Sequence, residues 1–374
     1  MRHDRHAPWP KWSDEEYQAP DDQGLPISIG PPGIPYRTPL EIAASTSENP
    51  DWVWSGYAAL GAITEVDGKI KSSGKTTLVM HLVAAILDGQ PFLGQPTMRT
   101  NVVYLTEQTP GPFREALARA GVLLRGAELR LVFRAEVTGM PWAELIAQVA
   151  ADAKHDGYGL LVVDTLGKLA QVREENDAGE GGRVMVPLQN AAHDGLAVIV
   201  CRHERKGGGE VGESGRGSSA ISGDVDVILQ LRRSEGNVPK SRRVIETLSR
   251  YVETPEKVVI ELTDDGYSLL GDEEAVSLAD GVRILSALLH EQFEQKETWT
   301  TDELVKETGL TRAAIQRSVK QMRLRGEKVD EFTDDGGKAR KGHPLQYRLV
   351  REIDSAQTNG LIGQKESSVG GPAA

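Results

Sequence analysis

A glycine-rich loop between a strand-like and a helix-like segment constrains the fold of this chain most. Residues 68–77 read GKIKSSGKTT and fit the pattern G-x-x-x-x-G-K-[ST]. The run 61–66 before the loop is typical of a buried strand, and the run 78–87 after it is apolar and lacks Gly and Pro. This order surrounds a phosphate with backbone N–H groups and the positive end of a helix dipole. It therefore predicts a nucleoside triphosphate site, against the alternative of a chance match in a glycine-rich loop.

The residues of this loop have different expected roles. Lys75 is expected to reach the β- and γ-phosphates, and the Thr76 hydroxyl is expected to bind Mg²⁺. The expected ligands of the loop are thus a nucleoside triphosphate and Mg²⁺. The full predicted binding set is Gly68, Lys71, Ser72, Ser73, Gly74, Lys75, Thr76 and Thr77.

A second strand-like segment ends in a carboxylate. Residues 160–165 read LLVVDT, so Asp164 closes an apolar strand. Because strand ends line the ligand crevice of an open α/β sheet, Asp164 is expected to hold the magnesium ion through water. Many buried strands also end in Asp at a turn, but the position downstream of a phosphate-binding loop favours the metal role.

Two further residues at strand ends are candidates for the chemistry of hydrolysis. Glu107 follows the strand-like segment 101–106 and is the best-placed base for an attacking water, unless it only caps the next helix. His203 follows the segment 197–201 and is a candidate sensor of the γ-phosphate, although a lone His at a strand end is often structural.

Two glycine-rich, charged stretches follow these strands. The first, 173–183, comes after Asp164, and the second, 202–219, contains His203. The glycine content of 202–219 predicts a mobile loop whose basic residues, Lys206 among them, could contact DNA phosphates or a neighbouring subunit's nucleotide. The alternative is a surface loop with solvated charges.

Composition limits the class of protein. The chain has 374 residues, enough for two or three domains, and ordinary fractions of hydrophobic (39%) and charged (26%) residues. Its net charge of −12 argues against coating nucleic acid with its whole surface, but allows local basic grooves. The single cysteine, Cys201, excludes an internal disulfide and fits a reducing compartment.

Since no apolar stretch is long enough to span a bilayer and the start lacks a signal-peptide core, we expect a soluble cytoplasmic protein without membrane contact.

Strand-like and helix-like segments alternate over residues 38–270, which predicts an α/β fold with a mostly parallel sheet covered on both faces. We expect 1–37 to be a disordered arm, 271–280 an acidic linker and 353–374 a disordered tail. The expected strands are 61–66, 101–106, 130–134, 160–164, 197–201 and 226–231, with 243–248 and 257–262 as an antiparallel extension; the expected helices are 76–87, 111–120, 142–154 and 184–193.

Residues 281–352 show a different pattern of three helices and a hairpin. An apolar-periodic helix at 278–295 comes first, Thr301 is the expected N-cap of the second, and 311–323 is the third. A basic hairpin tip at 334–341 precedes a last strand. Helix, helix-turn-helix and wing together resemble a winged helix, a common DNA-binding module.

The third helix has an apolar and a basic face. Ile315, Val319 and Met322 share the face expected in a core. The basic face and the wing favour DNA binding in an otherwise acidic chain, whereas the alternative is docking of a protein partner. With the loop lysine, the predicted DNA-binding residues are Lys206, Arg312, Lys320, Arg323, Lys338, Arg340 and Lys341.

The order of motifs resembles a known family. Trp-x-Gly-Tyr precedes the phosphate-binding loop, and a strand ending in Glu follows it. Then come Asp-Thr-Leu, Glu-Asn-Asp, a His with Arg-Lys-Gly-Gly-Gly, and Arg-Gly-Ser-Ser-Ala-Ile. This order looks like the RepA-like branch of RecA-type AAA ATPases, found in plasmid, phage and mobile-element replication proteins, over residues 38–270. The resemblance implies a RecA-like ATPase core that forms a ring, often a hexamer, with ATP at subunit interfaces.

The resemblance also implies roles for single residues. His203 resembles the family's sensor, and Arg216 resembles the residue before Gly-Ser-Ser that acts as an arginine finger across an interface. Relatives often carry a His pair where this chain has Arg202 and His203, so only the second member is kept. By the same resemblance, Lys75 and Thr76 bind phosphate and Mg²⁺, Glu107 activates water, and Asp164 supports the metal.

Together these patterns predict an ATP-hydrolysing, DNA-associated motor of a mobile element or phage, with a ring-forming replicative helicase as the leading interpretation. An ATP-dependent DNA-binding or regulatory protein that never unwinds DNA is the alternative. A P-loop kinase would need a lid that supplies arginines and an acceptor pocket, and it fits less well. The expected partners are DNA, single-stranded at the core loops and duplex at the winged helix, and further copies of the chain.

Overall fold

The computed structural model describes residues 36–69, 73–172, 178–204, 211, 219–234, 238–336, 338, 340–341 and 344–350. The chain divides into a first unit, Met1–Asp51, and a second unit, Trp52–Ala374. In the first unit, a short helix α1 (Pro39–Ser45) begins at Thr38, which forms a capping box with Glu41. The tail expected at 353–374, and all but the last two residues of the arm expected at 1–37, lie outside the described residues.

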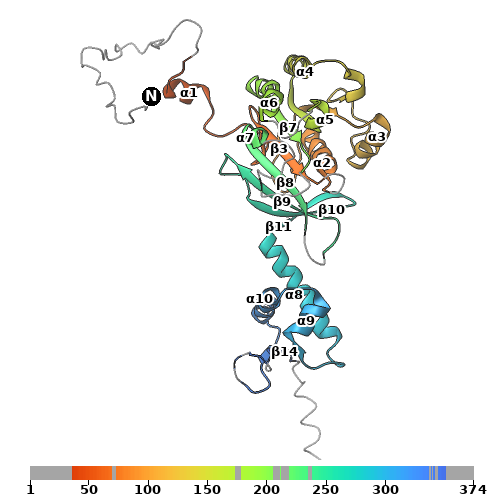
Figure 1. Cartoon of the computed structure of the whole chain (residues 1–374), viewed down its shortest axis with the longest axis vertical. Coiled ribbons are helices and arrows are strands. Elements are labelled where there is room, and N and C mark those ends of the chain that lie inside the picture. Colours follow the sequence, from red (N-terminus) through yellow and green to blue (C-terminus); the bar gives the residue numbers. More distant parts are fainter. Residues whose placement is uncertain are drawn as a thin grey trace, which may run out of the picture. The chain divides into compact units, whose positions relative to one another are not determined.

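A large sheet dominates residues 52–271, which we call the sheet core (Figure 1). Its strands follow the order β11-β10-β9-β8-β3-β7-β6-β4-β5, counted over the described residues. The strands from β8 to β5 pair in parallel, and β9, β10 and β11 extend the sheet in antiparallel fashion. The strands are β3 (Ile63–Gly68), β4 (Asn101–Thr106), β5 (Leu129–Phe133), β6 (Tyr158–Asp164), β7 (Ala197–Cys201), β8 (Val227–Arg233), β9 (Arg242–Ser249), β10 (Lys257–Thr263) and β11 (Gly266–Gly271).

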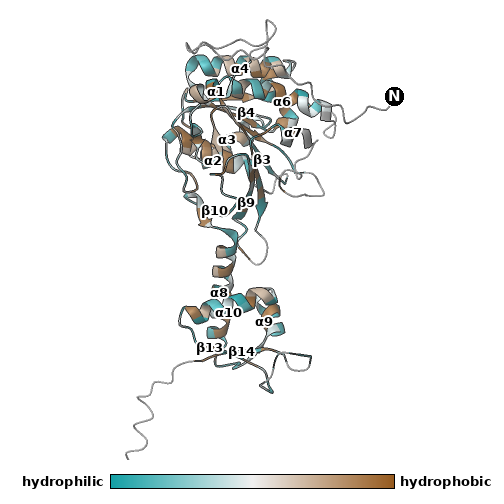
Figure 2. Ribbon diagram, turned by 90° about the vertical axis from the view of Figure 1, so that its left-hand side faces the viewer, coloured by the Kyte–Doolittle hydropathy of each residue, from teal (hydrophilic) through white to brown (hydrophobic). Residues whose placement is uncertain are grey.

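Helices cover both faces of this sheet, which confirms the expected α/β class with a large, mostly parallel sheet. Side chains of β3 alternate between two cores, so Val66 packs with α2 (Lys75–Asp88) and α3 (Pro110–Arg119). Ile63 packs on the opposite face with α4 (Trp142–Asp156) and α6 (Ala178–His193). The central strands are buried on both faces, so they are mostly apolar, β7 over its whole length, although β3 also buries Thr64, Glu65 and Asp67 (Figure 2 colours the chain by hydropathy).

The structure adds short elements that the sequence pattern does not reveal. They contain two to six residues, too few for a periodic signal, and β11 has no regular alternation of apolar and polar side chains. Apart from β11 they are β1 (Trp52–Trp54), β2 (Ala58–Ala59), η1 (Arg134–Val137), α5 (Leu166–Leu169) and α7 (Ser219–Gly223). The expected longer strands and helices are confirmed, with ends that differ by a few residues.

The stretch expected as an acidic linker is helical instead. The helix α8 (Glu273–Glu291) begins directly after Asp272, whose side chain accepts a hydrogen bond from the backbone N–H of Ala275. Acidic residues in a first turn interact favourably with the helix dipole, so Glu273 and Glu274 favour a helix start here. The expected helix 278–295 is therefore the later part of a helix that starts earlier.

Residues 272–350, called the C-terminal bundle here, have a core of their own. Leu285 of α8, Ile315 of the third helix and Tyr347 of the last strand are fully buried in it. The strands that the structure describes here form an antiparallel sheet in the order β12-β14-β13. The elements after α8 are β12 (Trp299–Thr300), α9 (Thr301–Thr308), α10 (Arg312–Leu324), β13 (Val329–Phe332) and β14 (Gln346–Leu349).

The N-cap of α9 lies one residue before the predicted one. The Thr300 side chain accepts from the backbone N–H of Glu303, and the Glu303 carboxylate accepts from the Thr300 backbone, which forms a capping box. A hydrogen bond from Lys296 and those from Thr300 lower the pKa of Glu303 to about 2. The predicted cap, Thr301, is buried and donates its hydroxyl to the carbonyl of Leu345 instead.

A close approach of α8 and α10 holds the bundle together. A Cβ atom at Gly281 of α8 would overlap the hydroxyl of Ser318 on α10, which is 1% exposed. A residue larger than glycine therefore fits at this helix crossing only if the Ser318 side chain rotates or one helix shifts.

We predict that Gly281→Ala destabilises the bundle by about 1–3 kcal/mol, because the added methyl overlaps the buried Ser318 hydroxyl. Thermal unfolding of the full chain measures this loss. The double variant Gly281→Ala/Ser318→Ala removes the overlapping hydroxyl and is expected to recover most of it, with Ser318→Ala alone as the control. Equal stability of Gly281→Ala and the natural chain would contradict the crossing described here.

Candidate nucleotide site

The parallel register brings four strand ends to one edge of the sheet. Val66 of β3 is paired with Cys201 of β7, and Cys201 is paired with Asp164 of β6. Asp164 is in turn paired with Thr106 of β4. The segments that follow these strands therefore leave the sheet side by side, which is the ligand-binding edge of open α/β sheets.

The phosphate-binding loop follows β3 and ends at the start of α2. Gly74 is the N-cap of α2 and has a φ of 90°, a conformation that favours glycine. Lys75 is the first residue of the helix, is 5% exposed, and donates from Nζ to the carbonyl of Gly68 over 2.7 Å. Burial lowers the pKa of Lys75. Two predicted loop residues, Lys71 and Ser72, lie outside the described residues.

Gly68, the first glycine of the loop, has no room for a side chain. A Cβ atom there would lie 2.6 Å from the carbonyl oxygen of Leu231 and 2.8 Å from the Cβ of Ser73. Leu231 belongs to β8 and Ser73 belongs to the loop, so a side chain at position 68 would displace either the strand or the loop. The pattern predicted this glycine as a phosphate-binding residue, and the structure gives it a packing role as well.

Asp164 accepts two hydroxyl hydrogen bonds at the same carboxylate oxygen. The Thr76 hydroxyl donates to Oδ2 over 2.7 Å, and the Tyr104 hydroxyl donates to it over 2.8 Å. Burial raises the pKa of the Asp164 carboxyl, while these two hydrogen bonds act in the opposite direction. Sequence analysis missed Tyr104, because an aromatic residue inside a strand looks like an ordinary core residue.

Thr76 and Asp164 suit a magnesium ion bound together with a nucleotide. Mg²⁺ prefers oxygen ligands and is usually held by one or two carboxylates and substrate phosphates. A hydroxyl and a carboxylate in contact beside the lysine of the loop meet that requirement. Within the described ranges, no group of three or more His, Cys, Asp and Glu residues could hold a metal on its own.

Glu107 is oriented by Thr165. The Thr165 hydroxyl donates to Glu107 Oε2 over 2.8 Å, and the Glu107 backbone N–H donates to the carbonyl of Asp164 over 3.0 Å. The peptide bond between Asp164 and Thr165 is cis. The helix that follows, α3, begins at Pro110 with Thr109 as its N-cap, so the alternative of Glu107 as its cap is wrong.

A cavity of about 440 Å³ lies between these groups. The structure thus brings Glu107, Asp164 and His203 together around the loop, as the sequence predicted for their positions. Their roles stay predictions. Arg216 and Lys206 lie outside the described residues. The cavity is lined by Lys69, Ser73, Gly74, Lys75, Thr76, Thr77, Glu107, Gln108, Asp164, Thr165 and His203.

A buried ion pair next to the cavity was not foreseen. Arg202, 3% exposed, donates from Nη1 to both carboxylate oxygens of Glu65, 1% exposed, over 2.8 Å. The Ser222 hydroxyl of α7 lies 3.0 Å from the same nitrogen. Burial raises the pKa of Glu65, and the charge of Arg202 opposes this. The pair links β3 to the residue that directly precedes His203 of the cavity.

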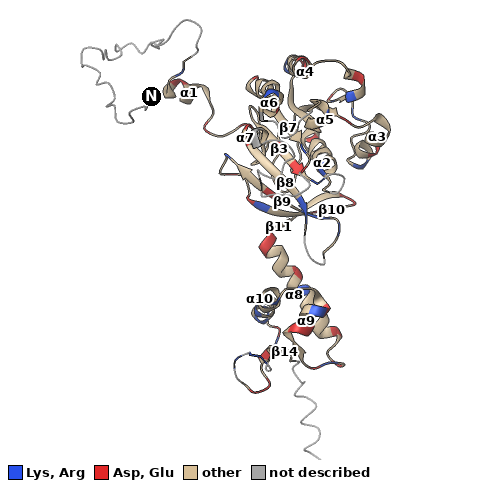
Figure 3. Cartoon of the chain, viewed as in Figure 1, with Lys and Arg blue, Asp and Glu red and all other residues tan. Residues whose placement is uncertain are grey.

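The predicted DNA-binding residues of the bundle are exposed, but several are engaged in ion pairs. Arg312 pairs with Asp302, and Arg340 pairs with Asp335. Arg323 donates to the carbonyl of Val329 and pairs with Glu331. Figure 3 shows basic and acidic residues together on the helices of this bundle. Lys320, Lys338 and Lys341 are exposed and form no ion pair with any residue that the structure describes.

Comparison with known proteins identifies one domain. Residues 37–209 match the family model of an AAA domain, a P-loop ATPase family. The match contains the phosphate-binding loop, Glu107, Asp164 and His203, and it supports nucleotide binding and ATPase activity in general. No curated protein matches the chain. Among the described residues, no helix combines the length and apolar composition needed to cross a membrane.

We predict that Arg202→Met destabilises the chain by about 3–5 kcal/mol, because it leaves the Glu65 carboxylate buried without its partner. Urea denaturation measures the loss. The double variant Glu65→Gln/Arg202→Met removes both charges and should be clearly more stable than the single one. Ser222→Ala is the matched control and should cost less than Arg202→Met, because it removes the two hydrogen bonds of the Ser222 hydroxyl, one with each partner, but leaves both charges paired. A double variant as unstable as Arg202→Met would contradict the pairing.

Proposed function

We propose that this chain is an ATP-hydrolysing, DNA-associated motor, and that it acts as a ring-forming replicative helicase of a plasmid, phage or mobile element. The observation that carries the ATPase part is the arrangement around one cavity of Lys75, the Thr76–Asp164 pair and the Thr165–Glu107 pair. The AAA domain match is compatible with the replication role, because this family is often found in replication proteins.

Each side chain would act on a different part of the reaction. Lys75 would neutralise the charge of the β- and γ-phosphates, and Thr76 and Asp164 would hold Mg²⁺, which when bound stabilises negative charge on the transferring phosphate. Glu107 would take a proton from the attacking water, since Thr165 holds its carboxylate at the cavity wall. His203, which lines the same cavity, would respond to the γ-phosphate.

The DNA part of the proposal rests on the C-terminal bundle. Its sequence of elements, α8-β12-α9-α10-β13-β14, is the order of helices and strands in a winged helix. The exposed lysines Lys320, Lys338 and Lys341 provide charge for phosphate contacts.

A second candidate is an ATP-dependent regulatory protein that does not unwind DNA. Three arginines of the proposed DNA-binding face, Arg312, Arg323 and Arg340, are paired with carboxylates. Such pairing leaves less charge for phosphates and favours docking of a protein partner. Strand displacement with a forked duplex separates the two candidates, because only the helicase would release the strand when ATP is hydrolysed.

We predict that Lys75→Ala abolishes ATP turnover and that Glu107→Gln slows it by about 100-fold or more, the usual contribution of a general base. Glu107→Gln keeps the shape of the side chain, so it should still bind ATP. A phosphate-release assay and nucleotide titration measure the two properties. Lys154→Ala serves as the control, because it removes an exposed lysine that does not line the nucleotide cavity. Normal turnover in Glu107→Gln would assign the base to another residue.

We predict that Lys320→Glu/Lys341→Glu weakens duplex binding and reduces the salt slope of log K by about 2, because each lost phosphate contact releases about one counterion fewer. Binding isotherms at several salt concentrations measure the slope. Lys154→Glu, on an exposed position of α4 in the sheet core, makes the same charge change per site outside the C-terminal bundle. An unchanged slope would favour the regulatory alternative with a protein partner.

A further inference from the structure

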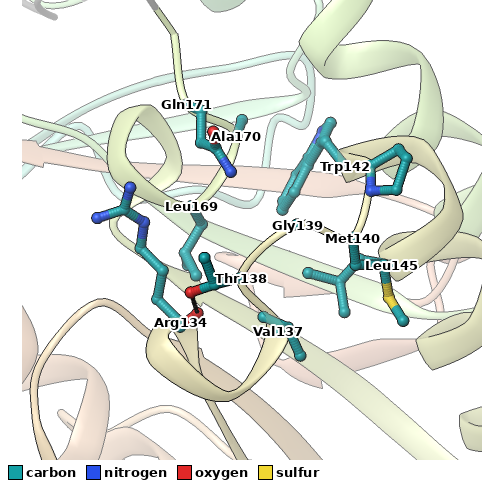
Figure 4. A pocket seen from close by; sticks show the side chains of 11 residues that line it. Arg134, Val137, Thr138, Gly139, Met140, Trp142, Leu145, Leu169, Ala170 and Gln171 are labelled. Atoms are coloured by element: carbon teal, nitrogen blue, oxygen red, sulfur yellow. Dashed lines mark hydrogen bonds between the residues drawn. The ribbon is translucent and has the colours of Figure 1, made fainter.

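We propose that a second pocket of the sheet core binds single-stranded nucleic acid, one base stacking on Trp142 and its phosphate pairing with Arg134. The pocket lies between η1, the start of α4 and the end of α5, and no predicted site residue lines it. Figure 4 shows Trp142, Leu169 and Val137 around the pocket, with Arg134 at its edge. The proposal rests on the proposed DNA association and adds a place and a chemistry to it.

The size and walls of the pocket suit a nucleobase. Its volume is about 480 Å³, within the range of small-molecule sites. Trp142 donates from Nε1 to the carbonyl of Val184 over 2.9 Å, which fixes the plane of its ring. Val137, Met140 and Leu169 complete an apolar wall, and the side chain of Met140 is 43% exposed. A base that stacks on such a fixed indole gains about 1–3 kcal/mol.

The polar groups of the pocket favour an anionic ligand. Arg134 is exposed and forms no ion pair with any residue in the described ranges, and none of the described residues that line the pocket is a carboxylate. The acids nearest along the chain, Glu136 and Glu144, are exposed but do not line it. Lys168 does not line the pocket but is exposed on α5 directly before the pocket residue Leu169, where it would offer a second cation to the next phosphate of a strand. Arg134 and Trp142 line opposite sides of one pocket (Figure 4), where an aromatic face can stack on a base and a guanidinium can bind its phosphate.

A single strand fits this chemistry better than a duplex or a free nucleotide. Bases of a duplex are already stacked on each other, so only an unstacked base presents its face to Trp142. A free nucleotide would leave Lys168 without a phosphate, whereas a strand carries one phosphate for each nucleotide. The occupant is therefore a strand, and free nucleotide serves as a comparison in the test.

The pocket is connected to the ATP cavity through α5. Thr165, whose hydroxyl holds Glu107, is the N-cap of this helix, and its carbonyl accepts from the backbone N–H of Leu169 over 3.1 Å. A strand that contacts Leu169 thus contacts the helix that begins at the partner of Glu107. Strand binding is therefore expected to raise the rate of ATP hydrolysis.

The test uses the full chain with ATP and a labelled oligothymidylate, followed by fluorescence anisotropy and by ATP turnover. Trp142→Leu and Arg134→Ala should each weaken oligonucleotide binding by about 5-fold or more, the lower end of the stacking range. Both should reduce stimulation by the strand and leave basal turnover unchanged. Trp142→Phe keeps an aromatic face and should retain most of the binding. Arg114→Ala, an exposed arginine of α3, is the matched control.

Four other outcomes would overturn the inference. If the natural chain binds the strand and the Trp142 and Arg134 variants bind it equally well, the strand binds elsewhere and only the assignment of this pocket is wrong. If the natural chain binds no single strand, the DNA part of the proposed function fails as well. Full competition by thymidine monophosphate at equal nucleotide concentration would assign the pocket to free nucleotides. A changed oligomeric mass in the Arg134 and Trp142 variants would assign it to contacts between copies.

Discussion

Four parallel strands, β3, β7, β6 and β4, end at one edge of the sheet. Their register pairs Val66 with Cys201, and Asp164 with both Cys201 and Thr106. A shift of one residue in any of these pairings would turn the side chains of that strand to the opposite face. The apolar runs of the strands fix the register, since both faces are buried between helices. The nucleotide cavity is therefore a consequence of how the core packs.

Hydroxyl groups connect the charged residues of the cavity to neighbouring elements. Tyr104 of β4 and Thr76 of α2 both donate to Asp164, and Thr165 donates to Glu107. Each carboxylate is thereby oriented by a group from an adjacent segment. Orientation before the reaction is favourable because no further ordering is needed in the transition state. The hydrogen bonds also counteract the effect of burial on Asp164.

The sequence predicts the parts of the structure that local patterns determine. The glycine-rich loop, the apolar strands and the carboxylates at their ends are patterns within a few residues, and they placed the cavity correctly. Tyr104 and Thr165 could not be assigned, because their partners are distant in sequence. The pocket at Trp142 depends on η1 and α5, which have only four residues each. Such short helices carry no periodicity.

Two helix starts in the C-terminal bundle are hard to predict, because neighbouring residues favour different N-caps or different structures. Thr300 and Thr301 both suit an N-cap, and tertiary contacts decide between them, since Thr301 bonds to Leu345 near the last strand. The acidic residues at 272–274 suggested a linker by composition, but acids also favour a helix start. Composition alone does not distinguish these two interpretations.

The ion pair between Glu65 and Arg202 has a consequence for the evolution of this protein. Either residue without the other leaves a buried charge, so substitution of one position alone passes through a destabilised chain. The two positions are therefore expected to change together among homologues. A homologue with histidine in place of Arg202 should lack the acid that corresponds to Glu65, and an alignment of close homologues would show this as a correlated pair of columns on β3 and after β7.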